Sequence, residues 1–137
     1  MNVIVDTCVW SLALRRNADQ NNMFVYELTA LIQESRAQLL GSIRQELLSG
    51  IKLQKQFQQL KKHLRAFEDI QLEEKDYELA AEYFNNCRQK GIQGSTTDFL
   101  ICAVSTRYNM PILTCDKDFS NFQAAITVNL HPLRKLE

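Results

Sequence analysis

Acidic side chains stand at the ends of several predicted structural elements, where folding can gather residues that are distant in sequence. Asp6 ends the first apolar stretch, Glu46 lies just after the second, Asp98 opens an apolar helix, and Asp116 follows a later strand, with Asp118 two residues on. Carboxylate oxygens are the ligands that hard cations such as Mg²⁺ and Mn²⁺ prefer. A divalent ion held in this way polarises phosphoryl oxygens and activates bound water, so these acids indicate phosphate chemistry.

Each acid also has an ordinary explanation when it is considered alone. Asp6 and Asp98 could cap helices, Asp116 and Asp118 could shape a turn, and Glu46 could be a solvated helix residue. Together they favour a metal site, because two unit charges about 4 Å apart repel by roughly 4 kcal/mol at an effective dielectric constant of about 20. Repulsion among several such neighbours is large beside a net stability of ~5–15 kcal/mol, so either some acids bind protons or a cation lies among them.

The hydrophobic pattern predicts strands that alternate with helices. We expect strands over residues 2–6, 38–43, 69–73, 111–115 and 125–130. Helical spacing predicts helices through Trp10 to Leu14 and over residues 23–34, 44–50, 53–67, 75–91 and 98–110. This alternation predicts an α/β fold with layers around a mainly parallel sheet. In such sheets ligands bind beyond the carboxyl ends of the strands, which is where most of these acids lie.

Composition narrows the class of protein. The 137 residues suit a single domain, residues 1–137, and 45% of them are hydrophobic. No apolar run approaches the ~20 residues that span a bilayer, and no basic segment precedes the first apolar stretch, so we expect a cytoplasmic protein without membrane association. Sixteen basic residues balance sixteen acidic ones, so nucleic-acid binding must depend on local patches such as the basic stretch 44–65.

The four cysteines show no C-x-x-C spacing, which argues against a zinc knuckle. We expect them to be reduced, buried and small. Cys8 and Cys115 lie beside the acids, which leaves a soft-metal or redox role open.

Four segments carry a resemblance to a known family: IVDTCVW, SIRQELLSG, TTDFLICAVS and PILTCDKDF. In this order they resemble the signature segments of PIN-domain ribonucleases, and within these the chain is most similar to the VapC-type toxins of toxin–antitoxin pairs. The resemblance implies a three-layer α/β/α sandwich and metal-dependent endonucleolytic cleavage of RNA, with Mg²⁺ as the cofactor and Mn²⁺ as the alternative. It also implies two partners: a small antitoxin that blocks the acidic pocket, and a second copy in a homodimer.

The resemblance assigns roles to particular residues. The acidic quartet of the family carries over to Asp6, Glu46, Asp98 and Asp116. We expect Asp6, Asp98 and Asp116 to hold the metal and Glu46 to position the attacking water or a second ion. Supporting roles fall to Thr7, Thr114 and Asp118, and contacts to flanking phosphates to Arg15, Arg44 and Lys117. Cys8 stands where the family more often has Asn or Ser, and Cys102 and Cys115 are also less usual.

Three other functions compete with this interpretation. A non-catalytic PIN-like module that binds RNA or protein typically loses acids of the quartet, whereas this chain keeps all four. A receiver-like signalling domain needs a paired acid early and a Lys at the end of the last strand, but Asp6 is followed by Thr7 and the last predicted strand runs into NLHPL. A DNA flap nuclease usually has more acids and a longer chain.

Overall fold

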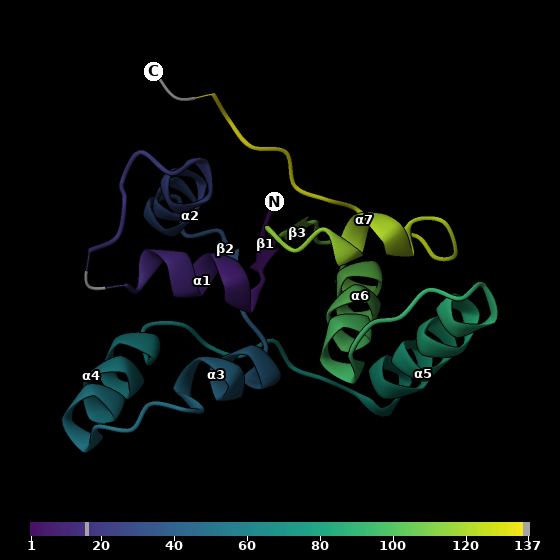
Figure 1. The fold of residues 1–137 in the computed structure, drawn as a ribbon, viewed down its shortest axis with the longest axis horizontal. Helices are drawn as coiled ribbons and strands as arrows, with labels where there is room; N and C mark the ends of the chain where they lie inside the picture. Colours follow the sequence, from purple (N-terminus) through teal and green to yellow (C-terminus); the bar gives the residue numbers. More distant parts are fainter. Residues whose placement is uncertain (16, 136–137) are drawn as a thin grey trace.

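A short parallel sheet lies at the centre of the computed structural model, which describes residues 1–15 and 17–135 (Figure 1). Strand β1 (Val3–Val5) lies between β2 (Ala37–Gln38) and β3 (Ile112–Leu113), and both neighbours run parallel to it. All three residues of β1 are fully buried, as expected for a central parallel strand that helices cover on both faces. The α/β prediction is therefore confirmed.

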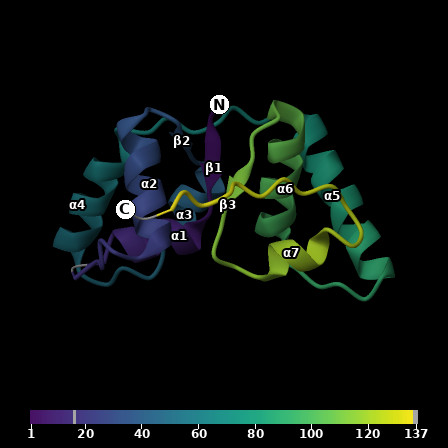
Figure 2. The ribbon, with the colours of Figure 1, turned by 90° about the horizontal axis from the view of Figure 1, so that it is seen from above.

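Helices form the outer layers of the sandwich. They are, in chain order, α1 (Thr7–Ala13), α2 (Met23–Gln33), α3 (Gly41–Leu48), α4 (Gln54–Leu64), α5 (Glu74–Gln89), α6 (Thr96–Tyr108) and α7 (Asp118–Phe122). Figure 2 shows α1 to α4 on one side of β1 and α5 to α7 on the other. None of the helices in the described part of the chain is long and apolar enough to cross a membrane.

Two of these helices begin close to the carboxyl edge of the sheet. The chain leaves β1 through Asp6 directly into α1, and the apolar helix α6 packs between the sheet and α5. The interior of α6 is made of small and branched residues from Ile101 to Val104, all buried. Trp10 of α1 is also buried, and its indole Nε1 donates a hydrogen bond to the Val5 carbonyl over 3.0 Å.

The strands are shorter and fewer than the sequence pattern predicts. The second strand ends at Gln38 because the chain turns into α3 at Gly41, and not after residue 43. The expected strands 69–73 and 125–130 each keep a single bridge, Asp69 to Leu39 and Leu130 to Ile112. The predictions for these two segments were wrong, because apolar residues there pack against the core without forming a ladder.

Two helix boundaries also differ from the prediction. Helix α6 begins at Thr96, and its N-cap is Ser95, so Asp98 is the third helical residue and not the cap. Residues 118–122, which the pattern left unassigned, form α7, and its Phe119 and Phe122 are fully buried. The first difference places Asp98 inside the first turn of α6, and the second places Asp118 at the start of α7.

Candidate functional site

Asp6 is the most deeply buried acid of the candidate site, with 6% of its surface exposed. It is the N-cap of α1, and its Oδ1 accepts a hydrogen bond from the Thr7 backbone N–H over 2.8 Å. Its Oδ2 accepts one from the Thr114 hydroxyl, also over 2.8 Å. Burial raises the pKa of Asp6, these two hydrogen bonds oppose the increase, and the charges of Asp98 and Asp116 add to it.

Thr114 connects two of the acids across the carboxyl ends of neighbouring strands. Its Oγ1 donates to Asp6 and accepts a hydrogen bond from the Asp116 backbone N–H over 3.0 Å. One hydroxyl thus fixes both the end of β1 and the turn after β3. Thr114, for which a supporting role is expected, thus hydrogen bonds both to the Asp6 carboxylate and to the Asp116 backbone.

Asp98 lies in the first turn of α6, where a reciprocal capping box holds it. Its backbone N–H donates to Ser95 Oγ over 3.0 Å, and its Oδ2 accepts a hydrogen bond from the Ser95 backbone N–H over 3.2 Å. Burial raises the pKa of Asp98, Ser95 opposes this, and the charges of Asp116 and Asp118 raise it further. Sequence reasoning missed Ser95, although the spacing Ser-x-x-Asp in STTD is a recognised capping-box signal.

Three carboxylates meet at the outer part of this site. One oxygen each from Asp98, Asp116 and Asp118 can be chosen so that all three lie within 4.8 Å of one another. Asp98 and Asp116 are half-buried and Asp118 is exposed. The Asp118 backbone N–H donates to Asp116 Oδ1 over 2.9 Å, which fixes the turn that carries both acids. Among the described residues Asp118, and not Asp6, completes this group of oxygens.

Glu46 approaches the same region from α3. Burial raises its pKa, and the charges of Asp6 and Asp98 raise it further, so the glutamate belongs to the same electrostatic group. The nearby Thr7 hydroxyl opposes this increase in the pKa of Glu46. It does not form a hydrogen bond with the carboxylate, because its buried Oγ1 has no partner among the described residues. Thr7 therefore supports Asp6 through its backbone N–H.

This set of donors fits a hard divalent cation. The acids supply only oxygen ligands, and Mg²⁺ and Mn²⁺ bind such ligands in preference to softer ions. Burial raises the pKa values of Asp6, Glu46 and Asp98, and the charges of neighbouring acids raise them further. A cation among these oxygens removes the repulsion, and the site can then bind the oxygens of a phosphate.

The three basic residues expected at phosphates have different environments. Arg15 and Lys117 are exposed, and Lys117 lies between Asp116 and Asp118 in the chain. Arg44 instead donates to the Leu64 and Phe67 carbonyls at the end of α4 and pairs with Asp69 over 2.9 Å. Its guanidinium thus ties α3 to the chain after α4, and a phosphate contact would require it to leave these partners.

The cysteines are free thiols, but they are not all buried. Cys8 and Cys115 are half-buried, which corrects the expectation, whereas Cys87 and Cys102 are buried. The Cys8 thiol donates to Asp6 Oδ2 over 3.7 Å and accepts a hydrogen bond from the Cys115 backbone N–H over 3.2 Å. Burial and the neighbouring Cys8 raise the pKa of Cys115 to about 12, which keeps its thiol protonated.

The fold and site together define an α/β domain with an acidic centre, suited to a divalent ion, at the carboxyl ends of its parallel strands. The family model of the PIN domain matches residues 3–125, and the chain belongs to this family. No curated protein shows significant similarity to the chain.

Solved structures from several bacteria have a similar fold, and three of them illustrate it. FitAcB from Neisseria gonorrhoeae aligns with a TM-score of 0.75 and 21% identity, covering 94% of this chain and 96% of that chain. VapBC2 from Rickettsia felis, bound to a DNA fragment from its promoter, gives 0.73 and 19%, with 96% and 98% covered. VapBC-5 from Mycobacterium tuberculosis, a member of the VapBC family of toxin–antitoxin systems, gives 0.67 and 18%, with 95% and 98% covered. These TM-scores show a shared fold at low sequence identity.

Proposed function

We propose that this chain is a Mg²⁺-dependent endoribonuclease and the toxin of a type II toxin–antitoxin pair, folded as one PIN domain over residues 1–137. The observation that carries the proposal is the group of oxygens from Asp98, Asp116 and Asp118 within 4.8 Å, next to the buried Asp6. Membership of the PIN domain family and the fold shared with FitAcB and VapBC proteins support it.

The acids divide the work between metal binding and proton transfer. Asp6, Asp98 and Asp116 hold Mg²⁺ or Mn²⁺, with Asp118 as a further oxygen donor at the exposed side. The bound ion supplies Lewis acidity toward a phosphoryl oxygen and lowers the pKa of a bound water. Glu46 positions the attacking water and accepts its proton, a role for which a raised pKa is suited.

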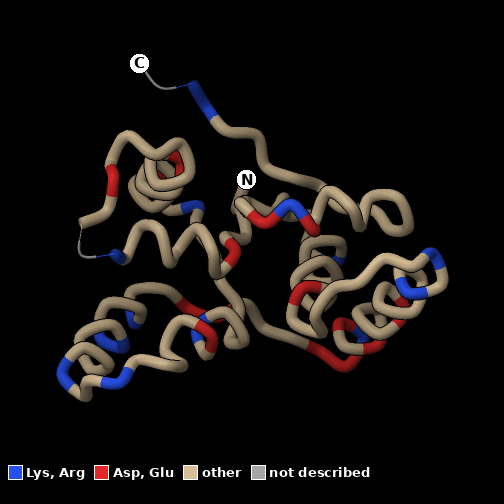
Figure 3. The backbone as a smooth tube through the Cα atoms, viewed as in Figure 1, with Lys and Arg blue, Asp and Glu red and all other residues tan. Residues whose placement is uncertain are grey.

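The surrounding residues keep these acids in place. Thr114 orients Asp6 and the Asp116 backbone, and Ser95 orients Asp98. The exposed Arg15 and Lys117 are available to phosphates on either side of the cleaved bond. Basic positions also gather along α4 (Figure 3), where they can attract the RNA backbone.

Two partners follow from the toxin proposal. A small antitoxin covers the acidic centre and blocks cleavage, and a second copy of the chain forms a homodimer in the cytoplasm. The fold shared with FitAcB and VapBC2 and with VapBC-5, a member of a family of toxin–antitoxin systems, supports the antitoxin. Co-expression with the product of the adjacent reading frame tests this: we expect a stable complex without cleavage activity, and an active complex would contradict the assignment.

Cleavage of labelled RNA tests the enzymatic part. Purified protein is incubated with RNA and with DNA of the same sequence, in Mg²⁺, in Mn²⁺ and in EDTA. We expect cleavage of RNA that requires the divalent ion and that falls at least ~100-fold in Asp98→Asn and Asp116→Asn. Glu78→Gln, an exposed change on α5, is the matched control and should retain full activity.

The same assay separates the competing functions. Preferential cleavage of DNA would indicate a DNA nuclease, and tight RNA binding without cleavage would indicate a non-catalytic module. Cleavage by Asp98→Asn at the wild-type rate would refute the proposed site, provided that circular dichroism shows both proteins folded.

A further inference from the structure

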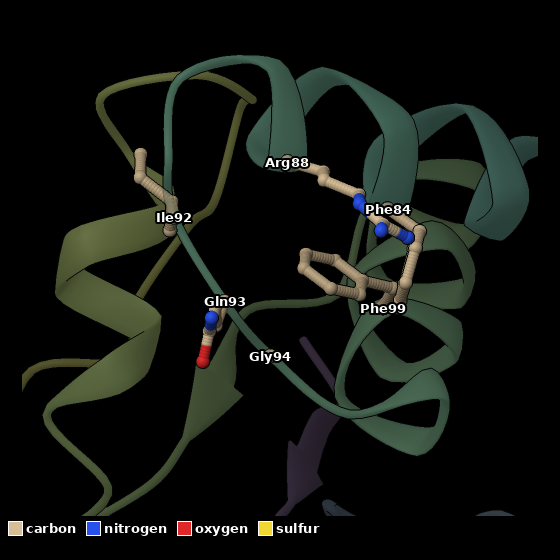
Figure 4. A pocket seen from close by; sticks show the side chains of 6 residues that line it. All are labelled: Phe84, Arg88, Ile92, Gln93, Gly94 and Phe99. Atoms are coloured by element: carbon tan, nitrogen blue, oxygen red, sulfur yellow. The ribbon is translucent and has the colours of Figure 1, made fainter.

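A pocket of about 280 Å³ opens between α5, the loop that precedes α6, and the first turn of α6 (Figure 4). Its lining consists of Phe84, Arg88, Ile92, Gln93, Gly94 and Phe99. None of these residues belongs to the acidic site, and the proposed cleavage reaction leaves the pocket without a role. Its volume lies just below the ~300–1,000 Å³ of sites for drug-sized molecules, so it suits a single planar group.

The inner wall of the pocket is aromatic and fixed. Phe99 has 1% of its surface exposed, and its ring packs edge-on against Phe84, with centroids 5.6 Å apart, and against Phe122 at 4.7 Å. Gly94 brings bare backbone against these rings, because a Cβ at this position would lie 2.5 Å from Phe122 Cζ and 2.9 Å from Phe99 Cζ. Gly94 thus covers Phe99 and Phe122, and the half-buried Phe84 is the lining aromatic side chain on which a flat ring can pack.

The opening of the pocket is polar and cationic. Arg88 lies one helical turn after Phe84, and Figure 4 shows its side chain running along the same side of the pocket. Arg88 and Gln93 are both exposed, and no hydrogen bond or ion pair between described residues uses the Arg88 guanidinium. An apolar wall beside an arginine and an amide matches a heteroaromatic ring with hydrogen-bond acceptors on its edge, which is the chemistry of a nucleobase.

The pocket lies one peptide unit from an acid of the proposed metal centre. Gly94, which lines it, is followed by Ser95, whose backbone N–H donates to Asp98 Oδ2 over 3.2 Å. Phe99, which forms its wall, directly follows Asp98 on α6. The pocket and the proposed metal centre thus share the loop before α6 and the first turn of α6.

We propose that this pocket binds the base of the nucleotide adjoining the cleaved phosphodiester, and that Arg88 selects guanine there; the proposal rests on the ribonuclease function proposed above. Guanine offers the N7 and O6 acceptors that an arginine binds in bidentate fashion. On the same edge adenine places an amino donor beside N7, and uracil has no two adjacent acceptors, so neither offers arginine this bidentate contact. Arg88 is therefore a specificity-determining residue and takes no part in the chemistry.

Cleavage of four RNA pools tests this proposal. The pools carry a single G, A, C or U in an otherwise constant unstructured strand, and the cleaved bonds are mapped by sequencing the ends. We expect wild-type protein to cut mainly next to G. Arg88→Ala should reduce this preference about 10-fold while the cleavage of the other pools changes little, since one bidentate contact gives discrimination of this order. Lys135→Ala, which removes an exposed charge outside the pocket, the acidic site and α4, should leave the preference intact.

The outcomes separate this proposal from the one on which it rests. Cleavage that requires Mg²⁺ but shows no preference sensitive to Arg88 would overturn the base pocket and leave the ribonuclease function standing. If no pool is cleaved, the ribonuclease proposal fails, and the affinities of the four RNAs in EDTA decide on the pocket. A preference for G that Arg88→Ala removes supports it, and equal affinities overturn it. Equal competition by inorganic phosphate and by guanosine monophosphate would show an anion site and would also overturn it.

Discussion

Replacement of Asp98 by Asn should make the metal-free protein more stable. Two unit charges 4.8 Å apart repel by about 3.5 kcal/mol at an effective dielectric constant of about 20 and by about 0.9 kcal/mol in bulk water. The variant removes the repulsion of Asp98 with Asp116 and with Asp118. Because Asp118 is exposed, the bulk-water value is the better guide, and the two pairs together give a gain of about 2 kcal/mol. The weaker capping box with Ser95 offsets about 0.5 kcal/mol of it.

The net stabilisation is about 1–2 kcal/mol, which raises Tm by about 3–6 °C for a domain of this size. The pKa of Asp98 is raised in the folded protein, so its ionisation opposes folding increasingly as pH rises from the unfolded pKa through the folded one. The gain should therefore be present near neutral pH and should disappear below the pKa of the unfolded chain. Urea unfolding in EDTA at several pH values measures it.

Millimolar Mg²⁺ provides the second measurement, because it should raise the Tm of the wild-type protein and have little effect on Asp98→Asn. Asp76→Asn is the matched control. Asp76 is buried and paired with Arg107 in the same half of the molecule, so this change should cost about 3 kcal/mol. Destabilisation by Asp98→Asn in EDTA, or equal stabilisation of both proteins by Mg²⁺, would refute the reasoning.

Three further changes have expected outcomes. Thr114→Val removes the hydroxyl that lowers the pKa of Asp6, so the acid limb of the pH profile of cleavage should move to higher pH, whereas Thr114→Ser should leave it in place. Gly94→Ala places a methyl group 2.5 Å from a Phe122 ring carbon and should destabilise the protein by about 1–3 kcal/mol in urea; an unchanged midpoint would contradict the packing described here. Burial alone would raise the pKa of Glu27, but hydrogen bonds from Arg134 and His131 lower it to about 2. The stability that this carboxylate provides is present above its unfolded pKa and lost as pH falls toward 2. Glu27→Gln should therefore lower stability at neutral pH and unfold with a weaker acid dependence, and parallel pH curves for the two proteins would exclude this role.

The convergence of the acids could be predicted because it depends on topology. A β-branched run before Asp6 and an apolar run before Thr114 identify two strands, and parallel strands place their carboxyl ends at one edge of a sheet. The lengths of the strands could not be predicted in this way. Residues 69–73 and 125–130 have strand-like composition, but a ladder also needs a partner along its length, and each segment meets its neighbour at one residue.

Side-chain partners depend on tertiary contacts that periodicity does not report. Arg44 looks like a free cation in the sequence, but the fold brings the end of α4 beside it, and the carbonyls of Leu64 and Phe67 accept its hydrogen bonds. From the sequence, Asp118 is expected to support Asp116 in the turn, but α7 begins at Asp118 and brings its carboxylate close to that of Asp98. Ser95 could have been found, since the capping box that it forms with Asp98 is a local pattern.

The acids become more exposed from Asp6 to Asp118, so the acidic centre has a closed inner side and an open outer side. Asp6 is buried and both its oxygens are held by Thr7 and Thr114, whereas Asp98 is half-buried and Asp118 is exposed. The inner carboxylate is thus fixed before any ion binds, and the outer ones remain accessible to solvent. Under the proposed function an ion and its phosphate approach from the Asp118 side, since the opposite side is closed by the sheet. The same inner rigidity explains why loss of the Thr114 hydroxyl should change the pH dependence, while loss of an outer carboxylate should change affinity for the ion.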